Sequence, residues 1–382
     1  MIIDKQNKKN IAYISGSRAD FGIMTPVLRA IKNSKKLNLQ LYATGMHLMN
    51  DFGGTINEIK KEFSGVVPIK TWFKGNERKY TARFMGSFLE KVVTVLEKYK
   101  PDFLLVMGDR PEMFCVALAG LYMGIPVAHV HGGERTTTVD ESARHAITRL
   151  AHLHFPATKE SAERIRKMGE EKWRITTVGA PALDTIIKEK LPTRDELFRS
   201  LNINPAEKIA LVTFHPVSEK WRLSGQQMGE IMAAIKGLNM VTVIIYPNTD
   251  AGSHFIINEI EKEKNNPRFR IYKNLPYKHF LALEREASVW IGNSSAAMIE
   301  SAYFGTPVVN VGDRQRNRER GDNVIDVRCI KKDVVSAIRK SIFKEKRYGK
   351  KIWGDGRASK RIVKILEDLK ITNRLLEKQI TY

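Results

Sequence analysis

Residues 127–154 of this 382-residue chain read VAHVHGGERTTTVDESARHAITRLAHLH. The stretch opens with an apolar run, Val127 to Val130, that predicts a buried strand. Gly132 and Gly133 then allow a sharp turn, and apolar residues from Ala143 onward recur at helical spacing. A buried strand followed by a turn and an amphipathic helix is the repeating unit of a parallel α/β sheet. We therefore expect an α/β fold with polar side chains at the carboxyl ends of its strands.

The same stretch is rich in groups that can transfer protons. Five of the nine histidines lie between residues 129 and 154. Glu134, Asp140 and Glu141 lie in the loop and at the start of the helix. Because several titratable side chains converge on one strand-to-helix loop, we interpret these three carboxylates and His131 as catalytic residues.

Structural roles are the alternative for these residues. Asp140 fits the N-terminus of the helix as a cap. His145, His152 and His154 fit core or surface positions, and for the last two we favour that interpretation. A metal site on His152 and His154 is disfavoured, because their spacing suits a strand face and no cysteine cluster accompanies them.

Glycine or a polar residue ends most of the other apolar runs. The first half of the chain predicts further strands at 11–15, 39–44, 103–107, 153–156 and 175–178, with helices that include 84–99 and 111–123. The second half repeats the pattern with strands at 209–214, 241–246, 289–291 and 307–311.

A charged segment at 188–205 has proline near both ends, which is typical of a link between domains. An amphipathic pattern predicts a last helix at 357–376.

This repetition predicts two Rossmann-like domains that face each other across a cleft. We expect residues 1–187 to form an N-terminal domain that carries the acid/base residues. Residues 188–350 form the expected nucleotide-binding domain, and residues 351–382 form a helix that packs back on the first domain.

The turn at residues 16–22, GSRADFG, follows the first strand and suits a phosphate. Arg18 offers a positive charge there, and the start of the helix offers backbone amides. The glycines match neither the dinucleotide fingerprint nor a P-loop. An ordinary turn between a strand and a helix is the alternative.

A second phosphate-binding turn is predicted after strand 289–291. Asn293, Ser294 and Ser295 offer backbone amides and hydroxyls at a helix start. Glu300 lies farther along that helix, where a carboxylate accepts hydrogen bonds from ribose hydroxyls. A capping serine and a surface glutamate are the alternative.

Three more candidates follow predicted strands. Asp109 is equally suited to be a general base or the partner of Arg110 in a salt bridge. His215 follows strand 209–214, and Arg314 follows strand 307–311. All of these positions fall at the carboxyl edge of a parallel sheet.

Composition restricts the partners that the protein can have. The net charge of +22 comes from 64 Lys and Arg against 42 Asp and Glu. The basic residues are spread along the chain and are not interleaved with aromatic residues, so we expect no nucleic-acid partner. The electric field of the net positive charge would still attract a small polyanion such as a nucleotide sugar. Because no apolar run is long enough to span a bilayer and the first ten residues lack the apolar segment of a signal peptide, we expect no membrane partner. Two cysteines, Cys115 and Cys329, build no disulfide framework, which favours the cytoplasm.

Together, the motifs resemble those of one family. In chain order they read GSRADFG from residue 16, TGMHLMNDFG from 44, GDRPE from 108, HGGE from 131, YPNTDAG from 246 and IGNSSAAMIESAYFGTPVVNVGDRQRNRERGDNVIDV from 291. The resemblance is to the hydrolysing UDP-N-acetylglucosamine 2-epimerases, and it covers about residues 11–327. It implies two Rossmann-like domains in the glycosyltransferase-B arrangement, with the terminal helix crossing back.

The resemblance also implies a reaction. The family converts UDP-N-acetylglucosamine and water to N-acetylmannosamine and UDP, commonly for sialic or related nonulosonic acids. A base removes the C2 proton while UDP leaves C1, and water then adds to the glycal. No nicotinamide, other cofactor or metal is implied, and the oligomeric state implied is a homodimer or homotetramer.

The family pattern assigns roles to the candidates in this sequence. Asp109, His131 and Asp140 match acid/base positions, with Glu134 and Glu141 beside them, and His215 matches the histidine near the diphosphate and C1. Arg18, Ser294 and Ser295 match phosphate contacts, Glu300 matches the ribose contact, and Arg110 and Arg314 add positive charge.

Two departures from the family pattern shape this interpretation. Many members carry Glu where this chain has His131, and an imidazole can remove a proton at neutral pH. Residues 136–138 are all threonine where members often have a glycine, which stiffens the loop. Ile23 or Met24 stands where the non-hydrolysing epimerases have a lysine, which favours the hydrolysing branch.

Other activities remain open from the sequence. The same reaction on a GDP-linked or diamino nucleotide sugar is the first alternative, followed by a non-hydrolysing UDP-N-acetylglucosamine 2-epimerase. A glycosyltransferase of the same fold would need an acceptor. A nucleic-acid-binding protein is the most distant alternative.

Overall fold

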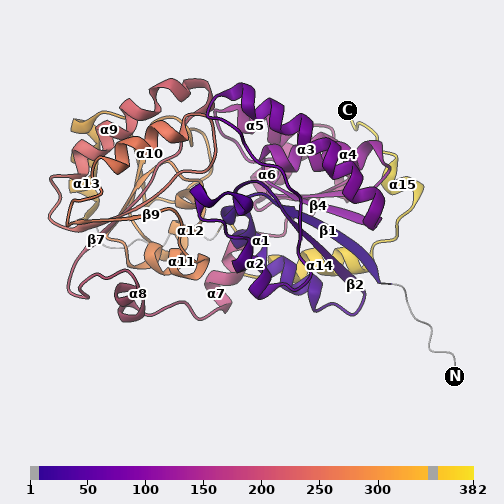
Figure 1. Cartoon of the computed structure of the whole chain (residues 1–382). Coiled ribbons are helices and arrows are strands. Elements are labelled where there is room, and N and C mark those ends of the chain that lie inside the picture. The colour runs from indigo at the N-terminus through magenta and orange to yellow at the C-terminus, as the bar shows by residue number, and fades with distance from the viewer. Residues whose placement is uncertain (1–7, 343–351) are drawn as a thin grey trace.

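A computed structural model describes residues 8–342 and 352–382, and its β-strands form two parallel sheets (Figure 1). The first sheet contains β1 (Lys9–Ser15), β2 (Leu37–Ala43), β3 (Val67–Pro68), β4 (Phe103–Met107), β5 (Val127–Val130) and β6 (Leu153–Phe155). The second contains β7 (Ile209–Thr213), β8 (Val241–Ile245), β9 (Phe269–Tyr272), β10 (Val289–Gly292), β11 (Val308–Val311) and β12 (Val324–Val327). The strand orders are β3-β2-β1-β4-β5-β6 and β12-β11-β10-β7-β8-β9. These two parallel sheets confirm the predicted α/β fold class.

Helices cover both faces of each sheet. In the first half they are α1 (Arg18–Lys32), α2 (Ile56–Glu62), α3 (Arg78–Tyr99), α4 (Pro111–Tyr122), α5 (Val139–Leu150), α6 (Lys159–Lys167) and α7 (Ala182–Lys188). In the second half they are α8 (Arg194–Ser200), α9 (Ser224–Ile235), α10 (Ser253–Glu261), α11 (Tyr277–Glu286), α12 (Ala296–Phe304), α13 (Lys331–Ile342), α14 (Ala358–Asp368) and α15 (Asn373–Leu376). In Figure 1, α3, α4 and α5 lie above the first sheet, and α1 and α14 lie below it. The strands between these layers are nearly continuous apolar runs, because both faces of a parallel sheet are buried.

The strand predicted at 175–178 is wrong. Only Ile175 pairs with the sheet, in an isolated bridge to His154. The amides of Thr176 and Val178 donate to the carbonyls of His154 and Pro156 at 2.9 and 3.0 Å. Because Pro156 has no N–H to return, the ladder does not continue.

The tail predicted as one helix at 357–376 is divided into α14 and α15. The ammonium of Lys9 donates to the carbonyls of Leu366 and Glu367 at 2.8 and 2.9 Å and also to that of Leu369. A cation that binds the last carbonyls of a helix stabilises its end at that point. The chain therefore leaves α14 at Leu369, where it is extended.

The edge strands β3, β9 and β12 were not predicted from the sequence. They are short or mixed in polarity, so their patterns are weak.

The predicted link at 188–205 contains α8, whose Leu197 and Phe198 are buried in the core of the second sheet. The predicted boundary between residues 350 and 351 lies outside the described residues.

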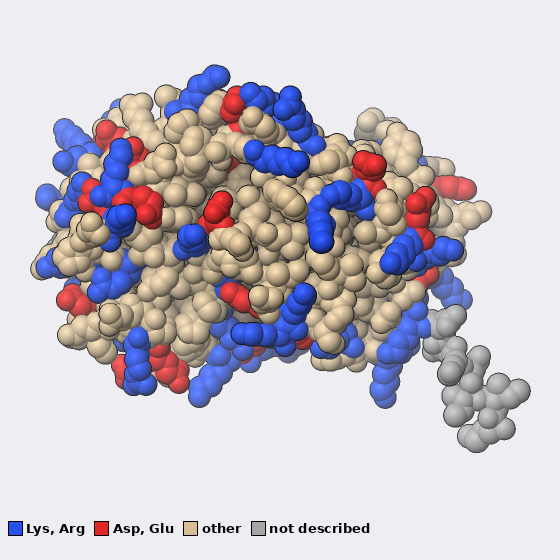
Figure 2. Space-filling view, viewed as in Figure 1, with Lys and Arg blue, Asp and Glu red and all other residues tan. Residues whose placement is uncertain are grey.

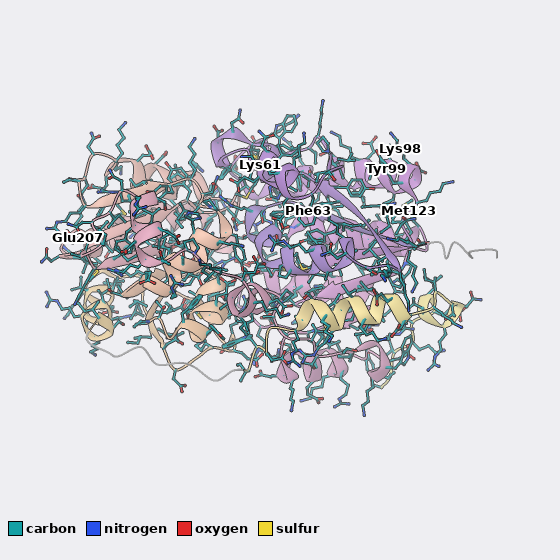
Figure 3. The ribbon with its side chains drawn as sticks, turned by 90° about the horizontal axis from the view of Figure 1, so that it is seen from below. Lys61, Phe63, Lys98, Tyr99, Met123 and Glu207 are labelled. Atoms are coloured by element: carbon teal, nitrogen blue, oxygen red, sulfur yellow. The ribbon has the colours of Figure 1, made fainter. Side chains whose placement is uncertain are left out.

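The C-terminal helix α14 packs on the first domain, and Figure 3, which shows the molecule from below, has it in yellow on the side facing the viewer. Ile362 and Leu366 of α14 are fully buried in the core that contains α1. Asp184 of α7 accepts hydrogen bonds from the amides of Ala358 and Ser359, both at 2.9 Å. A residue that is remote in sequence therefore caps the N-terminus of α14.

Replacing Asp184 with alanine tests this remote cap. Two buried amides lose their acceptor, so we expect the free energy of unfolding to fall by roughly 1–3 kcal/mol, as measured by urea denaturation. Asp195→Ala, at an exposed position on α8, is the matched control and leaves the midpoint nearly unchanged. Equal midpoints for the two variants would refute the cap.

Candidate active site

Two adjoining cavities lie between the sheets. The first, called here the His215 cavity, has a lining that includes Arg18, His215, Ser294, Ser295, Glu300 and Arg314. The second, called the Asp109 cavity, has a lining that includes Asp109, Arg110, His131, Glu134, Asp140 and Arg144. Ser295, Glu300 and Arg314 line both cavities, so the two share a wall. Most of the predicted site residues therefore surround one continuous space.

Asp109 follows β4 and is held by Arg144, not by Arg110. A guanidinium nitrogen of Arg144 donates to a carboxylate oxygen of Asp109. Arg110 instead lies 3.3 Å from Glu112 and 3.8 Å from Asp250. The predicted Asp109–Arg110 salt bridge is therefore wrong, because Arg144 on α5 reaches across to the end of β4.

The environments of Asp109 and Asp140 push their pKa values in opposite directions. Burial alone would raise the pKa of Asp109, but Arg144, Arg318 and Arg314 lower it below its ordinary value. Burial and the charge of Asp109 raise the pKa of Asp140, against the effect of Arg314. One cavity therefore holds an ionised carboxylate beside a carboxyl group that more readily keeps its proton, which suits proton transfer in both directions.

Asp140 does not cap its helix. Thr138 is the N-cap of α5, and its side chain accepts from the amide of Asp140 at 3.3 Å. The carboxylate of Asp140 lies instead 3.3 Å from the guanidinium of Arg314, which the second domain supplies. The capping alternative is therefore wrong, and Asp140 faces the cavity.

His131 and Glu134 form a hydrogen-bonded pair at the end of β5. The Nδ1 atom of His131 lies 2.6 Å from Oε1 of Glu134, and both side chains are buried. Against the cost of burial, the charges of Arg318 and His131 hold the pKa of Glu134 far below its usual range, so this carboxylate is ionised. An ionised partner keeps a proton on Nδ1, which leaves Nε2 as the ring nitrogen for a substrate.

The backbone of this turn is unusual. His131 has a φ of 60°, a left-handed conformation that few residues other than glycine adopt. At Gly133, with a φ of 76°, an added Cβ would lie 2.4 Å from the carbonyl oxygen of Ser161. The turn is thus fixed by close packing, and strained backbone of this kind clusters at functional sites.

His215 is held by Asn293. The amide of His215 donates to the side-chain oxygen of Asn293 at 2.7 Å, and the side-chain nitrogen of Asn293 donates to the His215 carbonyl at 2.8 Å. Burial, Arg314 and Arg110 lower the pKa of His215 to about 3, so its ring is neutral. Asn293 lines neither cavity and positions the histidine.

The N-terminus of α12 opens on both cavities. At Gly292, with a φ of 141°, an added Cβ would lie 1.8 Å from the carbonyl oxygen of Thr213, so only glycine fits this turn. Ser295 stands at the N-cap without a side-chain capping bond, and Ser294 lies beside it on the wall of the His215 cavity. Free amides and two hydroxyls therefore face the space where an anion binds best.

Glu300 is buried, not a surface residue. The hydroxyl of Tyr277 donates to one of its carboxylate oxygens at 3.2 Å, and the other oxygen has no partner among the described residues. Burial raises the pKa of Glu300, against the influence of the neighbouring Glu284 and Tyr277 side chains, which lower it. The unpartnered oxygen is free to accept a hydrogen bond from a ligand.

The remaining predicted residues have other partners. Arg18 lines the His215 cavity while it contacts Asn274 and Glu58. Arg110 lines the Asp109 cavity with one buried guanidinium nitrogen unpartnered among the described residues. Glu141 lines neither cavity, since its carboxylate accepts from the amide of Thr136 and supports the loop.

Of the histidines assigned structural roles, His152 and His154 are buried in the first domain and His145 is partly exposed. The Nδ1 atom of His152 accepts from the amide of Val127 at 3.1 Å, and Nε2 of His154 lies 3.0 Å from Glu170. His145 lies 3.7 Å from Glu141. Each ring has a partner within the fold.

Arg144 and Arg318 line the Asp109 cavity and pair with its carboxylates, and the sequence analysis missed both. Arg144 is 1% exposed, and it lies four residues after Asp140 on the buried face of α5. That position was the available signal, since an arginine on the buried face of a helix needs an anionic partner. Arg318 lies in a loop of the second domain and contacts Glu134 of the first, a contact for which the sequence gives no signal.

Positive charge is scattered over the view in Figure 2, with acidic side chains among the basic ones. No helix in residues 8–342 or 352–382 has both the length and the apolar character needed to cross a membrane.

Replacing Arg144 with glutamine tests the pair with Asp109. Because a mostly buried ion pair loses one partner, we expect the free energy of unfolding to fall by about 3 kcal/mol, measured by urea denaturation. Arg166→Gln, which removes an exposed arginine paired with Glu163, serves as control and should leave the midpoint nearly unchanged. A small effect in Arg144→Gln would show that Asp109 does not depend on this cation.

Comparison with known proteins places this geometry in a family. The family model described as UDP-N-acetylglucosamine 2-epimerase matches residues 29–367. A hydrolysing UDP-N,N'-diacetylbacillosamine 2-epimerase of Legionella pneumophila is 38% identical over 98% of this chain and 100% of its own length. A UDP-N-acetylglucosamine 2-epimerase of Neisseria meningitidis is 32% identical over 87% of each chain.

Solved structures agree in fold. The UDP-GlcNAc 2-epimerase from Neisseria meningitidis, bound to UDP-GlcNAc, has a TM-score of 0.76 at 19% identity and covers 94% of this chain and 99% of its own. The Methanocaldococcus jannaschii enzyme in complex with UDP-GlcNAc and UDP also has a TM-score of 0.76, at 21% identity over the same shares. The two domains thus have the glycosyltransferase-B-like arrangement that the sequence predicted. From the motifs, the fold and these matches together, the chain belongs to the UDP-N-acetylglucosamine 2-epimerase family.

Proposed function

We propose that this protein is a hydrolysing 2-epimerase that converts a UDP-linked 2-acetamido sugar and water to UDP and the free sugar epimerised at C2. One observation carries the proposal: two carboxyl groups with opposite pKa shifts and a histidine line a single cavity that adjoins the N-terminus of α12. The reaction needs a base, an acid and a site for a diphosphate leaving group, and these cavities offer all three.

In the first step a base takes the C2 proton, the C1–O bond breaks and UDP leaves with the bonding electrons. His131 suits the base, since its Nδ1 atom is held by Glu134 and Nε2 remains for the substrate. Asp109, whose pKa is lowered, is the second candidate for the base, since its ionised carboxylate lines the same cavity and, unlike that of Glu134, is not bonded to His131. The product of this step is a 1,2-unsaturated sugar.

In the second step the oxygen of water bonds to C1 and a proton is delivered to C2 on the opposite face. Asp140 suits the donor because burial and Asp109 raise its pKa. Removal of the C2 proton by one group and its return by a different group on the opposite face of the sugar would invert the stereochemistry at C2. Glu141 has no part in the proposal, because its carboxylate is directed to the loop.

Departure of UDP leaves negative charge on the diphosphate. These oxygens can accept hydrogen bonds from Ser294, Ser295 and the backbone amides at the start of α12. Arg314, which lines both cavities, adds positive charge. The neutral ring of His215 is suited to donate a hydrogen bond to the departing oxygen. Glu300, with its unpartnered oxygen, suits the ribose hydroxyls.

For the sugar itself, two candidates have support. UDP-N-acetylglucosamine is the substrate that the motifs predict. UDP-N,N'-diacetylbacillosamine, which carries a second acetamido group and a C6 methyl group, is favoured by the fuller match to the Legionella relative. Ile23, Ile299 and Ala182 form an apolar part of the Asp109 cavity that suits a methyl group.

Proton NMR in deuterated water, with each nucleotide sugar in turn, tests the proposal. We expect free UDP together with the C2-epimeric sugar that carries deuterium at C2. Faster turnover of the diacetyl substrate would assign it, and faster turnover of UDP-N-acetylglucosamine would assign the simpler sugar. Accumulation of the epimer with its diphosphate intact would replace the proposal with a non-hydrolysing epimerase.

Substitutions distinguish the residues proposed to transfer protons from the residues proposed to bind UDP. Asp109→Asn and His131→Gln should each lower kcat by about 10²- to 10⁴-fold while the affinity for UDP, measured by calorimetry, changes little. Ser294→Ala and Glu300→Gln should mainly weaken UDP binding. Unchanged turnover in Asp109→Asn or His131→Gln would remove that residue from the mechanism.

A further inference from the structure

A chain of polar contacts joins the two cavities and crosses from one domain to the other. The backbone carbonyl of Asn293, which holds His215, accepts from the side chain of Gln315 at 2.9 Å. The side-chain oxygen of Gln315 accepts from Arg318 at 3.1 Å, and Arg318 donates to Glu134. Glu134 in turn bonds Nδ1 of His131 at 2.6 Å.

Arg318 is the cation that the Glu134 carboxylate contacts. Arg144 and Arg164 of the first domain are near, but they donate to backbone carbonyls, those of Glu134 and Gly133 respectively. The Glu134 side chain is only 7% exposed and that of Arg318 only 10%. A carboxylate this buried needs a charged partner to remain ionised.

The loop that carries Arg318 is itself constrained. Asn317, the residue before it, has a φ of 63°. Arg314, four residues earlier, reaches Asp140 of the first domain. Strain at one residue and cross-domain contacts on both sides indicate a loop built to place its arginines in the cavity.

We propose that Arg318 is a positioning residue that the second domain supplies to the proton-transfer group of the first. It holds Glu134 in the orientation that fixes the Nδ1 proton of His131, so Nε2 is presented to C2 only when the two domains are closed on each other. The kinetic part of this inference rests on the proposed function, whereas the geometric part does not.

The geometric part is tested without substrate. Proton NMR of the full chain in water should show a downfield ring N–H signal for His131, assigned by its loss in His131→Gln. We expect the signal in the wild type and in Arg316→Gln, and we expect its loss in Arg318→Gln. Arg316 is the matched control, because it lies two residues away on the same loop, is 63% exposed and pairs with Asp313. A signal that persists in Arg318→Gln would overturn the inference.

The kinetic part is tested with the substrate that the wild type turns over. Arg318→Gln should lower kcat by about 100-fold, within the range that acid–base groups contribute, with little change in UDP affinity. Arg318→Lys should recover part of the loss, and free guanidinium should restore part of the activity of Arg318→Ala. A rise in KM at constant kcat would make Arg318 a substrate-binding group and overturn the inference. A wild type without turnover would refute the proposed function alone, since the N–H signal still decides the position of Arg318.

Discussion

The structure depends on the pairing of carboxylates with arginines in the cavity between the two sheets. Asp109 is paired with Arg144, Asp140 with Arg314 and Glu134 with Arg318. Removing a charged carboxylate from water is costly unless a partner compensates it. Because the Arg314 and Arg318 pairs join the two domains, the requirement for neutralisation also fixes how the domains face each other.

The three carboxyl groups differ in the direction in which their surroundings shift the pKa, and this difference bears on which of them can hold a proton. Asp109 is close to several arginines that lower its pKa, whereas burial and the charges of Asp109 and Asp250 raise the pKa of Asp140 against the effect of Arg314 and Arg144. Neutral His215 adds no cation of its own. Groups of one chemical type therefore acquire separate roles from their surroundings, as in other enzymes that perform acid and base chemistry in one site.

Central strands were predictable because both of their faces are buried, so β4 and β5 appear in the sequence as apolar runs ended by glycine or a polar residue. The edge strands and the division of the last helix were not, since they depend on pairing and on Lys9, more than 350 residues from the carbonyls that it binds. Likewise, the carboxylates of the site and Arg314 were found from their motifs, whereas the pairings of Arg144 and Arg318 depend on the fold. Arg318 meets Glu134 across 184 positions of sequence.

The proposed two-step reaction requires one base and one acid in the same cavity. After elimination, the group that accepted the C2 proton is protonated, and the acid still holds its own proton. In hydration the acid gives its proton to C2 as the oxygen of water bonds to C1, and the proton that water loses restores the acid. The sugar would then leave with C2 inverted, and the base must still give its proton to solvent before the next cycle. A cavity between two domains suits this proposed cycle, because a closed cavity would keep bulk solvent away while holding the one water that hydration uses, and an open one would let the groups exchange protons with solvent.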